Sequence, residues 1–343
     1  MSSARRSHRI GVIPGDGIGP EVTAEAMRVL SAVGEAEGFS LETVDYDLGA
    51  DRYLRTGEVL PRSVLEELPA LEAVQMGAVG DPRVPPGVLE GGLLLALRQQ
   101  LDLYINLRPS KLFDGVASTL AGVTPEDLDI TIVRENTEGL YARRGSAGGG
   151  GEPATEISVN TDRAIRRCVR YAFELAQAAG RSLTLVHKIN VLERAGGLWK
   201  SIFDEVSATY PDVPTAYQHV DACGYLMVTQ PRRFQVIVTD NLFGDILSDL
   251  AAGLVGGLGL VGSGNLRPGE LSVFEPVHGS APDIAGQGRA NPIAAVISAA
   301  LLLRHLGEAA GAARVEAAVA AVAGKSPGLS TRQIGDALVE ACT

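Results

Sequence analysis

The sequence predicts an α/β protein built around a largely parallel sheet. Short β-branched segments alternate along the chain with Ala-rich amphipathic segments, an order typical of strands connected by helices. The apolar run within Gln235–Thr239 does not alternate with polar residues, which indicates a strand buried on both faces. The chain has 343 residues and 45% hydrophobic content, enough for a large core divided between two lobes.

The individual elements follow from these patterns. We expect strands at 9–14, 129–135, 182–191 and 234–241, and helices at 21–38, 162–179 and 310–323. The glycine-rich run 145–153 predicts a flexible excursion without regular structure, because glycine loses much conformational freedom on ordering. Residues 253–264 carry glycine at many positions, which indicates a sharp crossing between lobes or a close approach of backbone to a ligand.

Composition excludes several classes of protein. A net charge of −11 argues against a nucleic-acid or anionic-membrane surface. The three widely spaced cysteines, Cys168, Cys223 and Cys342, fit a reducing compartment without structural disulfides, so we expect a cytoplasmic protein. The apolar stretch after the basic residues 5–9 is too short for a secretory signal, and the apolar run 293–303 is too short to span a bilayer.

A glycine-rich turn, residues 15–20, follows the first predicted strand. It lacks the third glycine of the dinucleotide-binding fingerprint, and no acidic residue ends a second strand about 20 positions later. We therefore interpret it as a structural turn before a helix, with Pro20 at the first helical position, and expect a fold other than the Rossmann fold.

Two aspartates in VTDNLFGDILSDL, residues 238–250, are candidates for metal binding. A helix beginning near Phe243 would place Asp245 and Asp249 one turn apart on one face, where uncompensated carboxylates repel. Hard oxygen ligands of this kind suit Mg²⁺ or Mn²⁺. Taken alone, the pattern more often indicates a solvated acidic face.

Three arginines are candidates for anion binding. Arg98 and Arg108 flank the segment LDLYIN, and Arg134 follows an apolar strand. The planar guanidinium binds a carboxylate through two parallel hydrogen bonds, so three of them could hold a dicarboxylate or tricarboxylate. Any one of them alone is typical of a surface ion pair.

A family resemblance emerges when further motifs are read in order. The chain contains NLRPSK at 106–111, VRENTEGLY at 133–141, HKINVL at 187–192, the aspartate segment, and EPVHGSAPDIAGQGRANP at 275–292. In this order they resemble the metal-dependent, NAD(P)-linked β-decarboxylating dehydrogenases, the isocitrate/isopropylmalate dehydrogenase family, over almost the whole length. The segment Gly80–Arg98 makes the isopropylmalate branch the most similar.

The resemblance implies roles for the charged residues. Arg98, Arg108 and Arg134 would hold the substrate carboxylates. Asp245 and Asp249 would ligate the metal together with Asp221, which in this family comes from the other subunit and so lies beside the substrate. The metal would act as a Lewis acid on the substrate hydroxyl and on the enolate formed later.

The resemblance also implies two catalytic residues. Lys188, contributed by the partner subunit in relatives, would act as or through the general base. A lysine needs desolvation or cationic neighbours to do so near neutrality. Tyr141 would protonate the enol carbon after CO₂ leaves. His187 would neighbour the site without ligating the metal.

The loop 279–291 matches the adenine-binding loop of the family. The resemblance implies that NAD is bound by His278, Gly279, Ser280, Ala281, Pro282, Asp283, Ile284 and Asn291. Asp283 would accept hydrogen bonds from the ribose hydroxyls and repel a 2′-phosphate, which favours NAD⁺ over NADP⁺.

The substituent of the substrate would be read just before Arg98. Leu94 and Leu95 stand there, and isocitrate enzymes carry polar groups at the positions of Gly92 and Leu94. Two leucines beside a branched alkyl group contribute roughly 1–3 kcal/mol of preference. D-malate and tartrate enzymes also carry leucines here, and LLLAL also fits the core face of a helix.

We therefore expect the isopropylmalate/isocitrate dehydrogenase-like fold. Its discontinuous first, nucleotide-side lobe would comprise residues 1–106 and 257–343, and the second lobe, 107–256, would carry an intersubunit arm at about 145–160. The expected enzyme is a homodimer with shared sites that converts 3-isopropylmalate to 2-oxoisocaproate, CO₂ and NADH in leucine biosynthesis. Alternatives are a paralogue acting on D-malate, tartrate, isocitrate, homoisocitrate or another 3-substituted malate, a noncatalytic regulatory subunit, and a nucleotide-binding module without chemistry.

Overall fold

The computed structural model describes residues 6–343, so Arg5 of the basic N-terminal stretch lies outside the described residues. The chain forms two compact units. Unit 1 comprises the residues up to Leu103, then Phe113–Thr119 and Val255–Thr343, and unit 2 comprises Tyr104–Leu112 and Leu120–Leu254.

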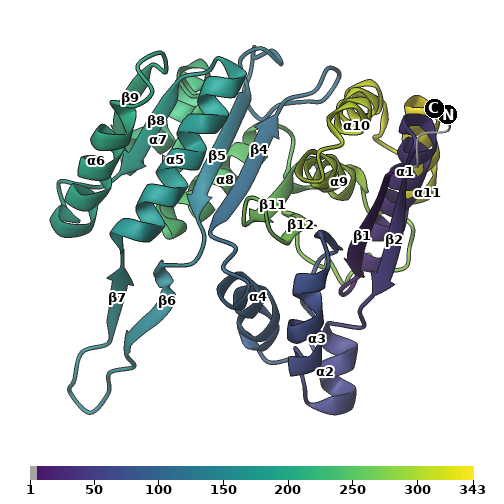
Figure 1. Cartoon of the computed structure of the whole chain (residues 1–343), viewed down its shortest axis with the longest axis horizontal. Coiled ribbons are helices and arrows are strands. Elements are labelled where there is room, and N and C mark those ends of the chain that lie inside the picture. Colours follow the sequence, from purple (N-terminus) through teal and green to yellow (C-terminus); the bar gives the residue numbers. More distant parts are fainter. Residues whose placement is uncertain (1–5) are drawn as a thin grey trace. The chain divides into compact units, whose positions relative to one another are not determined.

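Unit 1 contains the first and last segments of the chain (Figure 1). Its elements are β1 (Arg6–Ile13), α1 (Gly19–Glu37), β2 (Phe39–Asp45), α2 (Ala50–Thr56), α3 (Arg62–Glu67), η1 (Leu68–Ala70), β3 (Ala73–Met76), η2 (Glu90–Leu95), α4 (Ala96–Gln100), η4 (Leu258–Leu260), β11 (Gly262–Leu266), β12 (Ser272–Pro276), α9 (Ile293–His305), α10 (Ala309–Val322), η5 (Ala323–Lys325) and α11 (Thr331–Cys342).

The strands of unit 1 lie in the order β2-β1-β3-β12-β11, and only the β11–β12 pair is antiparallel. Successive residues of β3 face opposite sides of these strands. Val74 and Met76 join one apolar cluster with Leu93 and Leu97, whereas the Gln75 amide donates to the Ala295 carbonyl of α9 on the other side at 3.5 Å. Helices α1, α9, α10 and α11 supply the second cluster, so these strands are covered on both faces.

Unit 2 contains the central part of the chain. Its elements are β4 (Ile105–Lys111), β5 (Asp129–Glu135), β6 (Gly139–Ser146), β7 (Thr155–Val159), α5 (Asp162–Ala179), β8 (Leu183–His187), α6 (Glu193–Ser207), β9 (Thr215–His219), α7 (Val220–Thr229), η3 (Pro231–Arg233), β10 (Val236–Thr239) and α8 (Asn241–Leu254).

The main strands of unit 2 lie in the order β4-β5-β10-β8-β9, and only the β4–β5 pair is antiparallel. Strand β10 is buried throughout, as its apolar sequence predicts. The predicted α/β class with a largely parallel sheet is therefore confirmed. None of the helices formed by residues 6–343 combines the length and apolar content that a bilayer crossing needs.

The helix α5 begins and ends where the sequence predicts, because both ends carry strong caps. The Thr161 hydroxyl accepts a hydrogen bond from the Ala164 amide at 3.2 Å, and Gly180 follows the helix in the left-handed region with φ 63°. The Glu138 carboxylate accepts from both the amide and the hydroxyl of Thr161, at 2.7 and 2.8 Å. These bonds tie the helix start to the segment between β5 and β6.

The glycine-rich run differs from the prediction of no regular structure. Strands β6 and β7 pair as an antiparallel hairpin that extends from the body of unit 2 (Figure 1), and β6 continues through Gly145 to Ser146. A Cβ at position 145 would lie 1.9 Å from the Thr155 carbonyl oxygen, so glycine allows the two strands to approach. Glycine here permits strand pairing as well as a turn.

Candidate active site

Helix α8 carries four polar residues on one face. They are Asn241, Asp245, Ser248 and Asp249, spaced i, i+4, i+7 and i+8. The helix begins at Asn241 rather than near Phe243, because the Asp240 carboxylate accepts a hydrogen bond from the Phe243 amide at 2.8 Å. The predicted placement of Asp245 and Asp249 on one face is confirmed.

Arg134, near the end of β5, lies against this face. Its Nε and Nη2 donate to Asn241 Oδ1 at 2.9 and 2.7 Å, and its Nη1 donates to Asp245 Oδ1. The arginine stem crosses α8 at Gly244, where a Cβ would lie 2.6 Å from Arg134 Cγ. Glycine at 244 therefore allows the buried guanidinium to reach along the helix.

Arg108, on the neighbouring strand β4, binds the next turn of the same face. Its Nη1 donates to Ser248 Oγ at 2.7 Å and lies 3.2 Å from Asp249 Oδ1, and its Nη2 lies 3.4 Å from Asp245 Oδ1. Two buried arginines thus compensate the charges of the two carboxylates. This compensation offsets the repulsion expected between carboxylates one helical turn apart.

Tyr141, on β6, completes this cluster. Its hydroxyl donates to Asp245 Oδ2 at 2.6 Å, and the Arg134 guanidinium lies 4.9 Å from the centre of its ring. Burial and the hydrogen bond to Asp245 raise the pKa of the Tyr141 phenol, so it is protonated at neutral pH. We call Arg108, Arg134, Tyr141, Asp245 and Asp249 the arginine–aspartate cluster.

Lys188 and Asp221 pair with each other in unit 2. The Lys188 ammonium donates to Asp221 Oδ1 at 2.7 Å, and the Asp221 side chain is 66% exposed. This hydrogen bond lowers the pKa of the Asp221 carboxyl. Within residues 6–343, no three His, Cys, Asp or Glu side chains gather in a group that could hold a metal ion.

His187 ends β8 directly before Lys188 and is buried. Its Nε2 lies 3.5 Å from Asp240 Oδ2, and its ring packs against Trp199 and Phe243. Burial lowers the pKa of His187 to about 4 and raises that of Asp240 to about 6. His187 is therefore a neutral packing residue at neutral pH.

Arg98 belongs to unit 1, on α4, and is buried. Its Nη2 lies 3.4 Å from Glu275 Oε1, which also accepts from Asn265 Nδ2 at 2.8 Å. The preceding turn, η2, is a π-helix, a wide turn that often occurs at functional sites. It leaves Leu94 and Leu95 half-buried, and Leu94 packs on the edge of the apolar cluster that contains Leu93 and Leu97.

The loop before α9 holds the residues predicted to bind NAD. Its Ser280 carbonyl accepts a hydrogen bond from the Ile18 amide at 2.8 Å, and Ala281 has a positive φ of 38°. The Asn291 side chain accepts from the Ile293 amide and so begins α9. Asp283 is exposed, whereas burial lowers the pKa of His278.

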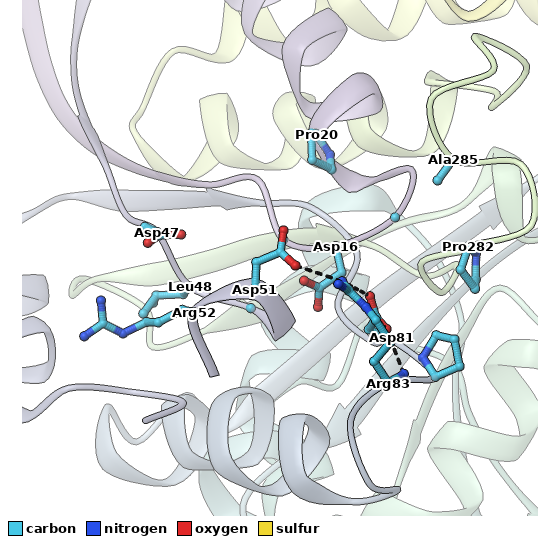
Figure 2. A pocket seen from close by; sticks show the side chains of 14 residues that line it. Asp16, Pro20, Asp47, Leu48, Asp51, Arg52, Asp81, Arg83, Pro282 and Ala285 are labelled. Carbon is cyan, nitrogen blue, oxygen red and sulfur yellow. Dashed lines mark hydrogen bonds and ion pairs between the residues drawn. The ribbon is translucent and has the colours of Figure 1, made fainter. Parts of the chain in front are cut away.

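A pocket of about 510 Å³ in unit 1 adjoins this loop. It is lined by the turn after β1, the start of α2, the segment 81–83, and Pro282 and Ala285. Figure 2 shows the Arg83 guanidinium bridging Asp51 and Asp81, with Nη2 2.8 and 2.6 Å from their carboxylates. Sequence reasoning missed this acidic lining, although the GDPR segment at 80–83 could have drawn attention to it.

Sequence reasoning also missed Asn241 and Ser248. Both lie in the segment that contains the two aspartates, four residues before and three after Asp245, where a helix places neighbours. The structure brings together five of the predicted residues in the arginine–aspartate cluster and pairs Lys188 with Asp221. Arg98, Leu94, Leu95 and the predicted NAD-binding residues belong to unit 1.

Comparisons with known proteins identify the family. A model of the isocitrate/isopropylmalate dehydrogenase family matches residues 9–343. The 3-isopropylmalate dehydrogenase of Thermobifida fusca is 55% identical over 98% of both chains, and that of Streptomyces griseus is 57% identical over 97% of this chain and 98% of the relative. The crystal structure of isocitrate dehydrogenase from Methylococcus capsulatus superposes with a TM-score of 0.88 at 40% identity, covering 98% of this chain and 99% of that chain. The chain belongs to the isocitrate/isopropylmalate dehydrogenase family.

Proposed function

We propose that this chain catalyses the NAD⁺- and divalent-metal-dependent oxidative decarboxylation of 3-isopropylmalate to 2-oxoisocaproate, CO₂ and NADH. The observation that carries the proposal is the arginine–aspartate cluster, where two buried guanidinium groups adjoin two carboxylates on α8. Such a site can receive a carboxylate-bearing substrate and a cation side by side. The names of the relatives at 55% and 57% identity support the substrate.

The side chains on α8 fit a hard cation. Asp245 and Asp249 supply only oxygen donors, and their side chains keep 36% and 59% exposure, so solvent and ions can reach them. We propose that they hold Mg²⁺ or Mn²⁺ together with Asp221 of a partner chain. When bound, the cation supplies Lewis-acid stabilisation of negative charge on the substrate oxygens.

We propose roles for the other residues from the family resemblance, and their chemistry supports these roles. Arg108 and Arg134 bind and orient the substrate carboxylates, and we propose that Arg98 shares this task. Tyr141 holds a proton on its phenol and is the proposed donor to the enol carbon after CO₂ leaves. Lys188 is the proposed route for removal of the substrate hydroxyl proton.

The surface of unit 1 fits NAD⁺ better than NADP⁺. Asp283 is exposed in the predicted adenosine loop, whereas the carboxylates of the adjoining pocket are already engaged, since Arg83 pairs with Asp51 and Asp81. The Asp283 carboxylate can accept hydrogen bonds from sugar hydroxyls and would repel a 2′-phosphate. NAD⁺, when bound, accepts the hydride from the substrate.

We propose that Leu94 and Leu95 favour a branched alkyl substituent on the substrate. Leu93 in the π-helical turn and Leu97 on α4 both belong to the apolar cluster, whereas Leu95 lies outside it. Truncating Leu95 should therefore change the preference among malates without opening the core.

A homodimer is supported by apolar side chains that unit 2 exposes. Val191, Leu192, Tyr225, Val228 and Ile246 are each at least 37% exposed, and Tyr225 and Val228 lie on α7 with Asp221. Apolar side chains exposed in such number on neighbouring elements mark protein interfaces. We propose that a second copy covers this surface, with Lys188 and Asp221 serving the partner's site and the β6–β7 hairpin acting as the intersubunit arm.

The two units would then have different functions. We propose that unit 1 is the nucleotide-side lobe and that unit 2 carries the dimer interface. The three cysteines are free and buried, which fits the reducing cytoplasm that we propose as its location.

One panel of assays tests the proposal. NADH formation should be fastest with 3-isopropylmalate among isopropylmalate, isocitrate, homoisocitrate, D-malate and tartrate, and EDTA should abolish it. Faster turnover of isocitrate would reject the substrate assignment, and activity that persists in EDTA would reject the metal. Inactivity with every malate, together with an effect on a related enzyme's activity, would instead support a regulatory subunit.

A further inference from the structure

We propose that Asn241 and Ser248 are positioning residues for substrate binding. They would hold the guanidinium groups of Arg134 and Arg108 in place when Asp245 and Asp249 exchange those groups for a cation. This inference rests on the proposed function, and it assigns a task to two neutral side chains that lie among the charged ones on α8.

Asn241 anchors Arg134 through a single oxygen. Asn241 Oδ1 accepts from both Nε and Nη2 of Arg134, at 2.9 and 2.7 Å, and both side chains are 1% exposed. The Asn241 amide nitrogen donates to the Glu138 carbonyl at 3.1 Å, which fixes its orientation. Glu138 is in turn bonded to the start of α5, so the anchor is held by more than its own helix.

Ser248 anchors Arg108 in an equivalent way. Its hydroxyl donates its single proton to the Asp245 carbonyl at 3.0 Å, which leaves the oxygen lone pairs for Arg108 Nη1 at 2.7 Å. The serine is fully buried, so water does not compete for this bond. Each arginine is thus held by at least one neutral acceptor and by at least one carboxylate.

The neutrality of both anchors matters because of charge balance. In this structure the carboxylates of Asp245 and Asp249 compensate Arg108 and Arg134. A divalent cation at those carboxylates would draw them away from the guanidinium groups. Neutral acceptors keep the arginines in position and leave their positive charge for the substrate carboxylates, whereas a further carboxylate there would compete with the substrate.

The test compares three variants with the parent enzyme. Ser248→Ala removes one acceptor, and Asn241→Leu removes the other. Asn241→Asp keeps the acceptor, adds a charge and removes the donor to the Glu138 carbonyl. A matched control is Ser298→Ala, because Ser298 is also a fully buried helix serine that donates to its own helix, at 2.9 Å, but lies on α9 of unit 1. Calorimetric titration of 3-isopropylmalate into enzyme with Mg²⁺ and no dinucleotide measures affinity without turnover.

We expect each of the three variants to weaken 3-isopropylmalate about tenfold or more, in both Kd and KM, because an arginine loses a charge-assisted bond or gains a competing anion. The KM for NAD⁺ and the behaviour of Ser298→Ala should stay unchanged. Unchanged substrate affinity in folded Ser248→Ala would overturn the proposal, as would an equal loss of NAD⁺ affinity. If Asn241→Leu does not fold, the substrate affinities of Ser248→Ala and Asn241→Asp still test the proposal.

Failure of the proposed function gives a different result. In that case the parent enzyme itself would neither bind nor turn over 3-isopropylmalate. Failure of this inference alone leaves an active parent enzyme whose variants bind the substrate as tightly as it does.

Discussion

The Tyr141 hydroxyl donates to Asp245 Oδ2 at 2.6 Å, while Arg134 and Arg108 approach the other oxygen of the same carboxylate. Both oxygens of Asp245 are therefore engaged by donors. A cation that binds Asp245 would compete with these donors, so the proposed proton donor directly contacts the proposed metal ligand.

Replacing Tyr141 with phenylalanine should change metal affinity and turnover in opposite directions. Tyr141→Phe removes a donor from Asp245, so the affinity for Mn²⁺ should rise about fivefold, the equivalent of one hydrogen bond of about 1 kcal/mol. Turnover should fall by about 100-fold or more, because the proposed proton donor is gone. Titration of Mn²⁺ and steady-state kinetics measure the two quantities, and unchanged turnover would remove Tyr141 from the chemistry.

Two inactive variants should restore activity when mixed. If Lys188 serves the partner's site, a heterodimer of Tyr141→Phe and Lys188→Ala has one site with both replacements and one with neither. Random exchange of subunits would then return about one quarter of the parent activity, since half of the dimers are mixed and each has one intact site. A mixture that stays inactive after complete exchange would place Lys188 in the site of its own chain.

Two glycines on α8 should respond in opposite ways to alanine. Gly244→Ala places a Cβ 2.6 Å from Arg134 Cγ, so the unfolding free energy should fall by about 1–3 kcal/mol and substrate affinity should fall with it. Gly253→Ala meets no atom within 4 Å and should stabilise the helix by about 0.5–1 kcal/mol. Chemical denaturation of both variants checks the contrast, and equal effects would contradict the close approach of Arg134.

Asp240 should make stability depend on pH. Burial raises its folded pKa to about 6, above its ordinary value of 3.8, so the stability of the folded state is greatest below pH 3.8 on this account and is lost as pH rises through 6. Asp240→Asn removes the buried charge and keeps an acceptor for the Phe243 amide. At pH 7.5 it should gain up to about 3 kcal/mol in unfolding free energy, and this gain should shrink toward pH 4. A gain that does not vary with pH would contradict the shifted pKa.

Asp283 should set the choice of dinucleotide. Asp283→Arg removes a carboxylate that would repel a 2′-phosphate and adds a cation that would attract one. The ratio of kcat/KM for NAD⁺ to that for NADP⁺ should fall by about tenfold or more. A ratio equal to that of the parent enzyme would show that the adenosine ribose of the dinucleotide does not bind beside Asp283.

Local signals explain how much of the fold was predictable. Strand β5 and helix α5 have the predicted bounds, because the β-branched segment ITIV marks the strand, and Thr161 and Gly180 mark the helix ends. The β6–β7 hairpin was not predictable in the same way. Its pairing depends on contacts between residues on either side of the glycine run, which no local pattern encodes.

The candidate site could likewise be predicted only in part from local sequence patterns. The helical spacing of Asp245 and Asp249 was readable from the sequence, and so was the choice of Arg108 and Arg134 as candidates for anion binding. That these two arginines lie on paired strands, β4 and β5, was not predicted. The neutral anchors were not, because an asparagine or a serine in a helix is ordinary until a buried arginine is seen to donate to it. The π-helical turn was hidden in the same way, since LLLAL fits the core face of any helix.

The wide turn at Glu90–Leu95 has a consequence for engineering this enzyme. A π-turn holds one residue more than the α-helical turn it replaces, so deleting a single residue there would convert it to regular helix. Such a deletion would rotate everything before it by about 100° relative to Arg98. The side chains that we propose to lie beside the substrate could then be exchanged as a set while the guanidinium stays where it is, an opportunity that point mutations of Leu94 or Leu95 do not offer.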